Sequence, residues 1–473
     1  MRGLISAAGY LPYRRLARQD VAALLGSGGG RGTRAVAGYD EDTTTMAVEA
    51  ARLARRSAAA AAVDAVWLAT ASPAYLDKTN ATALHAALRL PAEAAAFDFG
   101  GALRSGMGAM VAATLATGTI VVAMSDQRDG LPGGADESFG GDAAAAVVVG
   151  DDAPGAPVIA EVLGRASATD EFLDRWRSPG ERRSKVWEER FAETRYLPLG
   201  RDAWERALKD GGVEAHQLTQ VAVTAMHGRA AKALGAKLGL GQGVLVDDLS
   251  GTVGQCGAAH PGLLLAGMLE RARPGDLMAL VHLADGADVV VLRATEAIAT
   301  WAPARPLAAQ VECGAPLTYG RFLSWRGMLT PEPPRRPEPQ RVSGPAAWRS
   351  EDWKFGFVGS RDRSSGAVHL PPSRVSMQGG ALDDMEQVPM ADAVGTVVTF
   401  TVDHLAYSPS PPVVFAVIDF DGGGRFPLEL TDVDVEQLAI GDRVEMTFRR
   451  LFSADGIHDY FWKARPQHSA AAG

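Results

Sequence analysis

The stretch Ala95–Met110, with the sequence AAFDFGGALRSGMGAM, determines the expected fold of this chain. It predicts a short strand, a glycine-rich turn at Gly100 and Gly101, and then a helix of small residues. A turn of this kind places one side chain at the N-terminus of a helix, where the helix dipole favours an anion. The shape is that of an active-site elbow, but Leu103 takes the place of the reactive side chain.

Outward from this elbow, residues 1 to about 300 alternate apolar runs with helical stretches of small residues, which is typical of an α/β protein. The predicted buried strands are 65–72, 119–126, 143–150, 219–227, 276–286 and 288–294. The predicted helices are 44–58, 79–90, 228–240 and 262–272. The second half repeats the order of the first, with a more charged insertion near 168–200, and this predicts a duplicated architecture.

The composition changes after Trp301. An amphipathic helix is predicted in 316–329, followed by a solvated Pro/Arg linker in 330–341. Regular strand alternation from about residue 392 predicts a small all-β barrel. The predicted domains are 1–155 and 156–297 for the two α/β halves, 298–345 for helix and linker, 346–388 for a strand-and-turn segment, 389–466 for the barrel, and 467–473 for a disordered tail.

Charge and cysteine content exclude several classes of protein. The 56 acidic and 47 basic residues give a net charge of −9, and no Lys/Arg-rich block could follow a phosphate backbone, so a nucleic-acid partner is not expected. The absence of a signal peptide or a long apolar run predicts a soluble cytoplasmic protein without a membrane partner. Cys256 and Cys313 are the only cysteines, which excludes a disulfide framework and a Cys-rich metal site.

Six segments carry a family resemblance over residues 1–297. They are TTMAVEAARLA, WLATASPAYLDKTNATALHAALRL, AAFDFGGALRSGMGAM, FGGDAAAAVVVG, RAAKALGAKLGL and ARPGDLMALVH. Their order and spacing resemble the thiolase superfamily, most closely its ketoacyl synthase III and HMG-CoA synthase branch. The resemblance implies a five-layered α-β-α-β-α fold, usually dimeric, that binds acyl-CoA or acyl carrier thioesters and makes or breaks a carbon–carbon bond.

The C-terminal part is similar to the acyl-CoA-associated OB-fold proteins that accompany thiolases in complexes. The resemblance rests on YGRFLSWRGML, FGFVGSRDRSSGAVHLPPSRV and FWKARP. It implies an N-terminal helix, a rubredoxin-like zinc ribbon over 346–388 and an OB-fold. A structural zinc ion in such a ribbon needs four cysteines in two pairs. This chain keeps the spacing but has Asp362, Ser365, Ser376 and Gly379 there, so the ribbon is expected to be degenerate and to hold no metal.

Read position by position, the thiolase resemblance places Leu103 where the family has its nucleophilic cysteine. The family's catalytic histidine falls on Thr224, with His227 in the place of an asparagine, although a shift of register returns His227 to the histidine position. Gln255 takes the place of the second polar group and keeps an amide donor. Ala71 stands where HMG-CoA synthases have a glutamate base. With nucleophile, histidine and base replaced together, the ordinary condensing mechanism is not expected.

Five further residues are candidates for the substrate pocket, and four of them have a structural alternative. Cys256 is either a relocated nucleophile or, as we favour, a small buried residue. His260 is either catalytic or a packing and capping residue, and the second interpretation is favoured. Tyr75, Thr79 and Asn80 lie in a polar loop and helix start that the resemblance places near the substrate or the dimer contact. For Thr79 and Asn80 the structural alternative is capping of the following helix.

Three functional hypotheses follow, and whether the chain is an enzyme stays open. The first is a non-condensing pseudoenzyme subunit that binds acyl-CoA or CoA and no other cofactor, as a homodimer or beside an active thiolase. The second is a cysteine-independent retro-aldol lyase for β-hydroxyacyl-CoA, with Gln255 as oxyanion donor and His227, Tyr75 or His260 as base. The third is a purely structural partner.

Overall fold

The computed structural model describes residues 1–58 and 61–467. The chain divides into two compact units. Unit 1 comprises Met1–Ala37, Met46–Thr82 and Ala92–Tyr319, and unit 2 comprises Gly38–Thr45, Ala83–Pro91 and the chain from Gly320 onward. Most of the predicted tail, 468–473, lies outside the described residues.

Unit 1 is built on a nine-stranded sheet with the order β11-β12-β13-β8-β1-β7-β6-β4-β5. Its strands are β1 (Arg2–Tyr10), β4 (Ala65–Thr70), β5 (Ala95–Gly100), β6 (Ile120–Asp126), β7 (Ala143–Asp151), β8 (Ala160–Ala168), β11 (Gln220–Ala225), β12 (Leu277–Leu283) and β13 (Ala287–Ala294). Each of the six strands predicted from the sequence is present, which confirms the α/β class.

The strand pairing is duplicated. In the first half β1, β7 and β6 are antiparallel neighbours, and β6, β4 and β5 are parallel. In the second half β8, β13 and β12 are antiparallel, β12 pairs in parallel with β11, and Val221 of β11 makes a parallel bridge to Leu245. The halves meet where Gly3 and Leu4 of β1 pair with Glu161 and Ala160 of β8.

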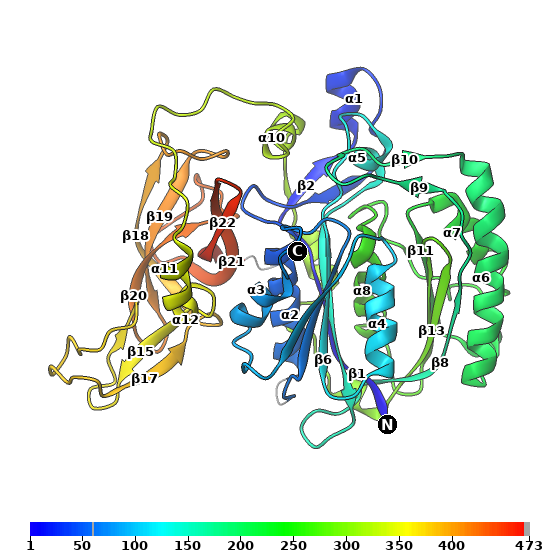
Figure 1. The fold of residues 1–473 in the computed structure, drawn as a ribbon, viewed down its shortest axis with the longest axis horizontal. Coiled ribbons are helices and arrows are strands. Elements are labelled where there is room, and N and C mark those ends of the chain that lie inside the picture. The colour runs from blue at the N-terminus through cyan, green and yellow to red at the C-terminus, as the bar shows by residue number, and fades with distance from the viewer. Residues whose placement is uncertain (59–60, 468–473) are drawn as a thin grey trace. The chain divides into compact units, whose positions relative to one another are not determined.

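Two helices of small residues lie between the two halves of the sheet, α4 (Ser105–Leu115) and α8 (His260–Leu269) (Figure 1). Close packing in this central layer requires glycine. A Cβ atom at Gly106 would lie 1.9 Å from the Ala258 carbonyl oxygen, and one at Gly262 would lie 2.4 Å from the Met124 side chain. The abundance of Ala and Gly in these helices is therefore a packing requirement of a buried layer.

The outer layers of unit 1 consist of α2 (Thr43–Ser57) on one side and of α6 (Glu189–Gly211) and α7 (Gly228–Gly235) on the other (Figure 1). The short helix α3 (Ala81–Ala87) falls mostly in unit 2. Ser6 of β1 donates a hydrogen bond to the Ala54 carbonyl of α2, and α6 packs on β8, where a Cβ at Gly164 would lie 2.4 Å from the Ala207 carbonyl oxygen. The result is the predicted α-β-α-β-α layering. The long helix α6 was not predicted, and it begins inside the charged insertion.

Short elements complete unit 1. They are α1 (Gln19–Leu25), α5 (Ala135–Phe139), α9 (Leu307–Glu312), three 3₁₀ turns at Ala215–Gln217, Gly257–Ala259 and Glu296–Ala299, a sheet of β2 (Arg14–Ala17), β3 (Thr33–Val36) and β14 (Ala315–Pro316), and a pair of β9 (Arg175–Trp176) and β10 (Lys185–Val186). The amphipathic helix predicted over 316–329 is the shorter α10 (Tyr319–Trp325).

Unit 2 contains a closed barrel with the strand order β18-β19-β20-β22-β21 and a three-stranded sheet with the order β16-β15-β17. The bounds are α11 (Gly344–Arg349), α12 (Glu351–Lys354), β15 (Val358–Asp362), β16 (Val368–His369), β17 (Met385–Pro389), β18 (Val394–Asp403), β19 (Val413–Phe420), β20 (Arg425–Leu430), β21 (Arg443–Ala454) and β22 (Ile457–Pro466). Phe357, Phe448 and Trp462 form an aromatic core, with ring centroids 5.4 Å apart for Phe448 and Trp462. The predicted small barrel is confirmed.

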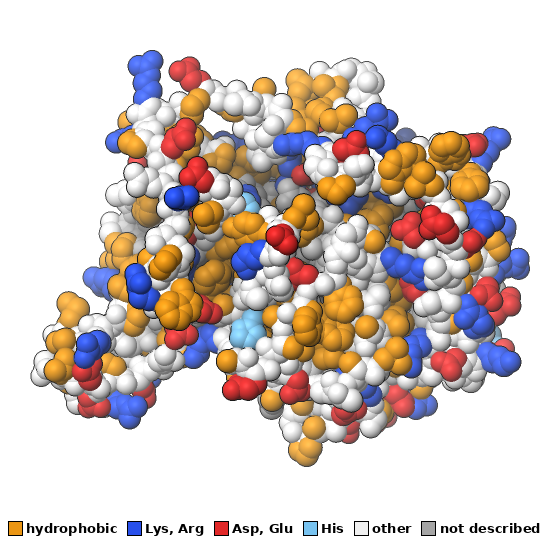
Figure 2. Space-filling model, in the orientation of Figure 1, with side chains coloured by type: hydrophobic (Ala, Val, Ile, Leu, Met, Phe, Trp, Pro, Cys, Tyr) orange, Lys and Arg blue, Asp and Glu red, His pale blue; other side chains and the backbone are white. Residues whose placement is uncertain are grey.

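Surface charges are of both signs. On the face seen in Figure 2, Lys and Arg side chains are interspersed with Asp and Glu side chains. Within 1–58 and 61–467, every helix is too short or too polar to cross a membrane.

Candidate functional site

A cavity of about 1490 Å³ opens in unit 1 where several parallel strands end. Its lining includes the residues after β4, β5, β6 and β11, together with the segment that carries β9 and β10. The carboxyl ends of parallel strands are the usual location of ligand sites in α/β sheets. The cavity is therefore the candidate functional site.

The elbow predicted from the sequence lines this cavity. β5 ends at Gly100, Gly101 adopts a φ of 91° that favours glycine, and α4 begins at Ser105. Leu103 lies between them, half-buried and in the cavity wall. The next residue, Arg104, is turned away and held by Asp288, with Nε and Nη2 donating to the carboxylate at 2.7 and 2.9 Å.

Thr224 and Gln255, far apart in sequence, are in direct contact. Gln255 Nε2 donates to Thr224 Oγ1 and to the Ala225 carbonyl oxygen, both at 2.9 Å. Thr224 is buried at the end of β11, and Gln255 lines the cavity. Both amide hydrogens of Gln255 are thus engaged by the protein in this structure, so donation to a ligand requires Gln255 to exchange a partner.

His227 lies at the start of α7 and lines the cavity. Its Nδ1 accepts a hydrogen bond from the Ala230 backbone at 3.1 Å, so the side chain caps the helix. Its ring faces Tyr196 of α6 with centroids 6.3 Å apart. His227 therefore combines a structural contact with access to the cavity.

The loop from Tyr75 to Asn80 is organised by Asn80. The Asn80 side-chain oxygen accepts from the Tyr75 backbone at 3.0 Å, and Nδ2 donates to the Tyr75 carbonyl and to Asp98. Asp98 also accepts from the backbone of Ala81 at the start of α3. Tyr75 and Asn80 line the cavity, whereas the exposed Thr79 lies outside its lining.

Cys256 and His260 are buried next to each other, outside the cavity lining. The Cys256 backbone donates to His260 Nδ1 at 3.2 Å, and His260 Nε2 lies 2.8 Å from the Asp248 carbonyl oxygen. Burial raises the pKa of the Cys256 thiol and lowers the pKa of His260 to about 4. Both residues have the environment of packing residues.

Sequence reasoning missed an acidic cluster on the second-half side of the cavity. Asp174, Tyr196 and Asp285 line it beside His227. Burial raises the pKa of Asp174, while the His227 charge and a hydrogen bond from Tyr196 act in the opposite direction. Burial, followed by the Asp174 charge, also raises the pKa of Asp285. A carboxyl group with a raised pKa in a cavity is a candidate general acid or base.

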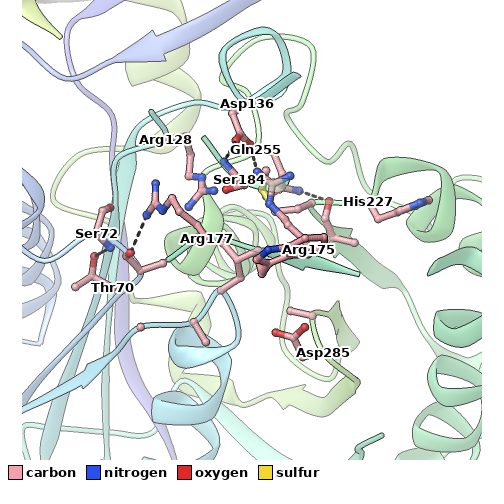
Figure 3. A pocket seen from close by; sticks show the side chains of 18 of the residues that line it. Thr70, Ser72, Arg128, Asp136, Arg175, Arg177, Ser184, His227, Gln255 and Asp285 are labelled. Atoms are coloured by element: carbon pink, nitrogen blue, oxygen red, sulfur yellow. Dashed lines mark hydrogen bonds and ion pairs between the residues drawn. The ribbon is translucent and has the colours of Figure 1, made fainter. Parts of the chain in front are cut away.

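Arginines that line the cavity were also missed, among them Arg128, Arg175 and Arg177. Arg128 follows β6, and Arg175 and Arg177 belong to the charged insertion. In Figure 3 their side chains gather in the middle of the cavity, apart from His227 and Asp285. These arginines come from segments that are brought together only by the fold. The high density of charged residues in the insertion was the one sequence signal for Arg175 and Arg177.

Of the four expected ribbon positions in unit 2, Asp362 ends β15 and Ser365 lies in the turn after it, while Ser376 and Gly379 lie in a second turn. Asp362 Oδ1 accepts from the Ser364 backbone and hydroxyl at 2.9 and 2.8 Å, and Oδ2 accepts from the Ser365 hydroxyl at 2.5 Å. A hydrogen bond from Ser376 also reaches Asp362, and Gly379 has a φ of 90°. Among the residues that the structure describes, no three His, Cys, Asp or Glu side chains are grouped as metal ligands would be.

Sequence comparisons match this chain to two different kinds of protein. Hydroxymethylglutaryl-CoA synthase of Picrophilus torridus is 28% identical over 305 residues, which are 61% of this chain and 85% of that protein. A DUF35 domain-containing scaffold protein of Methanocaldococcus jannaschii is 27% identical over 125 residues, 25% of this chain and 88% of that protein. A family model for the C-terminal OB-fold domain of ChsH2 matches residues 387–449.

Solved structures agree with the first match. A hydroxymethylglutaryl-CoA synthase complexed with CoA has a TM-score of 0.59 at 19% identity, covering 73% of this chain and 96% of that one. 3-Oxoacyl-(acyl carrier protein) synthase III of Pseudomonas aeruginosa has a TM-score of 0.53 at 24% identity, covering 62% and 98%. The chain is thus a thiolase-like domain, similar to hydroxymethylglutaryl-CoA synthase and to 3-oxoacyl-(acyl carrier protein) synthase III, fused to an OB-fold domain.

Proposed function

We propose that unit 1 binds a CoA thioester in its cavity without forming a covalent acyl-enzyme, and that the chain is a non-condensing subunit of a complex that forms or cleaves carbon–carbon bonds in acyl-CoA. The observation that carries this proposal is Leu103 at the elbow, in the cavity wall. A leucine side chain cannot attack a thioester, and the nearby thiol of Cys256 is buried outside the lining.

The comparisons support a CoA ester as the ligand. Two solved structures of the same fold contain CoA or 3-hydroxy-3-methylglutaryl-CoA. The match of 25% of this chain to a scaffold protein supports a role in a larger assembly. The exposed side of β5, the edge strand of the sheet, supports a homodimer, because unpaired strand edges are ready to pair with a second copy.

The test is calorimetry of the full chain with CoA, acetyl-CoA and longer acyl-CoA esters, together with intact-mass measurement after incubation. Binding without an added acyl mass is the expected result. An acyl adduct on the protein would contradict the non-covalent proposal. No heat of binding at millimolar ligand would overturn the CoA-ester proposal and favour the purely structural partner.

A second candidate is the cysteine-independent lyase, and Asp174 is the observation that favours it. In a retro-aldol step a base removes the β-hydroxyl proton of a β-hydroxyacyl-CoA, and the Cα–Cβ bond breaks as the carbonyl product forms. The electron pair goes to the thioester enolate, which then takes up a proton to give acyl-CoA. Asp174 or His227 supplies the base in this proposal, since His260 lies outside the cavity lining.

Incubation with a β-hydroxyacyl-CoA tests this candidate. We expect release of acyl-CoA together with an aldehyde or ketone, and a loss of at least about 100-fold in kcat for Asp174→Asn. Asp202→Asn, on the exposed face of α6, is the matched control and leaves the rate unchanged. Equal rates for Asp174→Asn and the unaltered chain would remove Asp174 from the mechanism, and no turnover of any β-hydroxyacyl-CoA would remove the lyase.

A further inference from the structure

Of the three arginines Arg128, Arg175 and Arg177, Arg177 is the one whose hydrogen bond goes to a neutral acceptor rather than to a carboxylate. Its Nη2 donates to the Ala71 carbonyl oxygen at 3.2 Å, a neutral acceptor (Figure 3). By contrast, Arg128 Nη1 lies 3.3 Å from Asp126 Oδ2, and Arg175 forms an ion pair with Asp136. Arg177 therefore keeps N–H donors for a ligand in the cavity, whereas Arg128 and Arg175 use donors in ion pairs with carboxylates.

Two of the carboxylates near the arginines, Asp126 and Asp136, already accept hydrogen bonds from other groups. Asp126 accepts from the Ser72 hydroxyl and from the Ala258 backbone at 3.1 Å, in addition to Arg128. Asp136 accepts from the Ser184 backbone at 3.2 Å in addition to Arg175. These contacts leave fewer acceptor sites on either carboxylate for an ion pair with Arg177.

Arg128 is held rigidly in place. Its backbone nitrogen donates to Asp142 Oδ1 at 2.9 Å, and its carbonyl accepts from Arg34 Nη2 at 3.0 Å. Arg34 and Asp142 form a fully buried ion pair with an N–O distance of 3.1 Å. The positive end of the cavity is thus part of the core and is present before any ligand arrives.

The arginines also act on one another. Burial, and then the like charges of Arg128 and Arg177, lower the pKa of Arg175 to about 10. Burial and the Arg128 charge lower the pKa of Arg177, while Asp126 and Asp129 partly compensate. Mutual repulsion of this kind is relieved when an anion binds among the guanidinium groups.

The position of Arg177 decides which anion fits. The carbonyl oxygen that accepts from Arg177 belongs to Ala71, the residue after Thr70 of β4. The Thr70 carbonyl oxygen in turn accepts a hydrogen bond from the backbone of Gly101, in the elbow, at 3.2 Å. The Arg177 guanidinium is therefore bound to the residue next to Thr70, and Thr70 is hydrogen-bonded to the elbow that contains Leu103. The phosphates of a CoA ester lie at the far end of the pantetheine arm from the thioester, so an anion at both places requires a charge on the acyl group itself.

We infer that the acyl chain carried into this cavity ends in a carboxylate, bound by Arg177 with Arg128 and Arg175 around it. This inference rests on the proposed binding of a CoA thioester and specifies its substrate class. Guanidinium–carboxylate pairs in a partly desolvated site are strong and directional, because two N–H groups meet two oxygens.

The test compares two five-carbon esters that differ only at the end of the acyl chain, glutaryl-CoA and pentanoyl-CoA. Calorimetry on the full chain is expected to give at least about tenfold tighter binding of glutaryl-CoA, from charge-assisted hydrogen bonds. Arg177→Gln should abolish this preference and leave the affinity for pentanoyl-CoA within about twofold, while Arg177→Lys should retain part of it. Arg201→Gln, on the exposed face of α6, is the matched control and keeps the preference.

Each outcome separates the inference from the function on which it rests. Binding of neither ester overturns the proposed function and the inference together. Equal affinities for the two esters, or a preference that survives Arg177→Gln, overturn the inference alone. If Arg177→Gln lowers the affinity for both esters equally, the arginine binds the CoA phosphates, and this result also overturns the inference of a carboxylate on the acyl chain.

Discussion

Leu103 stands at a helix start that would activate a thiol. α4 begins two residues later, and backbone N–H groups at such a terminus stabilise a thiolate. Leu103→Cys is therefore expected to gain one acyl group on incubation with acetyl-CoA, detected as a mass increase that hydroxylamine reverses. Leu103→Ser, with no base beside it, should stay unmodified. An unmodified Leu103→Cys protein that still binds acetyl-CoA would show that the elbow does not activate a nucleophile.

Asp362 occupies the place where the ribbon resemblance expects a zinc ligand. Hydroxyl and backbone donors from Ser364, Ser365 and Ser376 hold the pKa of Asp362 well below its usual range. Since its acceptor sites are filled and no thiolate accompanies it, protein purified with added zinc should contain much less than one equivalent by atomic absorption. One full equivalent, lost on Asp362→Ala, would contradict this prediction.

At the scale of elements, β5 is an exposed sheet edge. Phe97 on this strand is 56% exposed, although β5 pairs with β4 on its other side. We expect Phe97→Lys to convert a homodimer to a monomer in light scattering, because a charged edge resists strand pairing. Leu24→Lys, at an exposed position of α1, should leave the dimer intact. A monomeric unaltered protein, or a dimer unaffected by Phe97→Lys, would rule out this edge as the interface.

A buried charge network ties the segment Gly38–Thr45 to the barrel strands of unit 2. Lys463 Nζ lies 3.0 Å from Asp40 Oδ2 and contacts Glu429, and Arg449 contacts Asp40 and Asp432. Removing one buried ion leaves its partners unpaired. Lys463→Met is expected to lower the free energy of unfolding of unit 2 by about 3–5 kcal/mol in urea titrations.

The matched control for this network is an exposed ion pair on the same barrel. Arg425→Gln breaks the pair with Asp419, and at such a surface site the expected loss is below about 1 kcal/mol. If Lys463→Met lowers the free energy of unfolding by no more than Arg425→Gln does, the network does not stabilise the barrel. Unchanged hydrogen-exchange protection of β21 and β22 in the absence of urea shows that the Lys463→Met barrel is folded and keeps the comparison valid.

The sequence predicted elements better than it predicted the site. The predicted strands of unit 1 are present because buried parallel strands appear as apolar runs that need no tertiary information. The helix α6 was missed because charged residues dominate its sequence, although Tyr196, Ala203 and Ala207 are buried at helical spacing. Asp174 and Arg177 could not be placed from sequence, since only tertiary folding brings the insertion to the cavity.

At the scale of the whole molecule, Asp40 and Asp362 in unit 2 and the cavity carboxyls Asp174 and Asp285 in unit 1 contribute to acid stability with opposite signs. In unit 2, burial raises the pKa of Asp40, but the charges of Lys463 and Arg449 outweigh it and hold the value below that of the unfolded chain. The stabilisation from such a carboxylate is present above its unfolded pKa, about 4, and is lost as pH falls through the folded pKa. Asp362, with its lowered pKa, contributes in the same direction.

The cavity carboxyls of unit 1 behave in the reverse way. Burial raises the pKa of Asp174 and Asp285, so the folded state holds their protons more tightly than the unfolded chain does. Their contribution is most favourable below about pH 4 and is lost as pH rises through the folded pKa. Acidification from pH 7 to about 2 should therefore open unit 2 before unit 1. Hydrogen exchange read by mass spectrometry, corrected for intrinsic rates, is expected to show β18–β22 losing protection while β6 and β7 keep it. Asp174→Asn removes one of these two raised-pKa cavity carboxyls of unit 1 and should bring the pH values at which the two units lose protection closer together. Loss of protection in unit 1 before unit 2 would mean that other carboxylates dominate the acid response of unit 1.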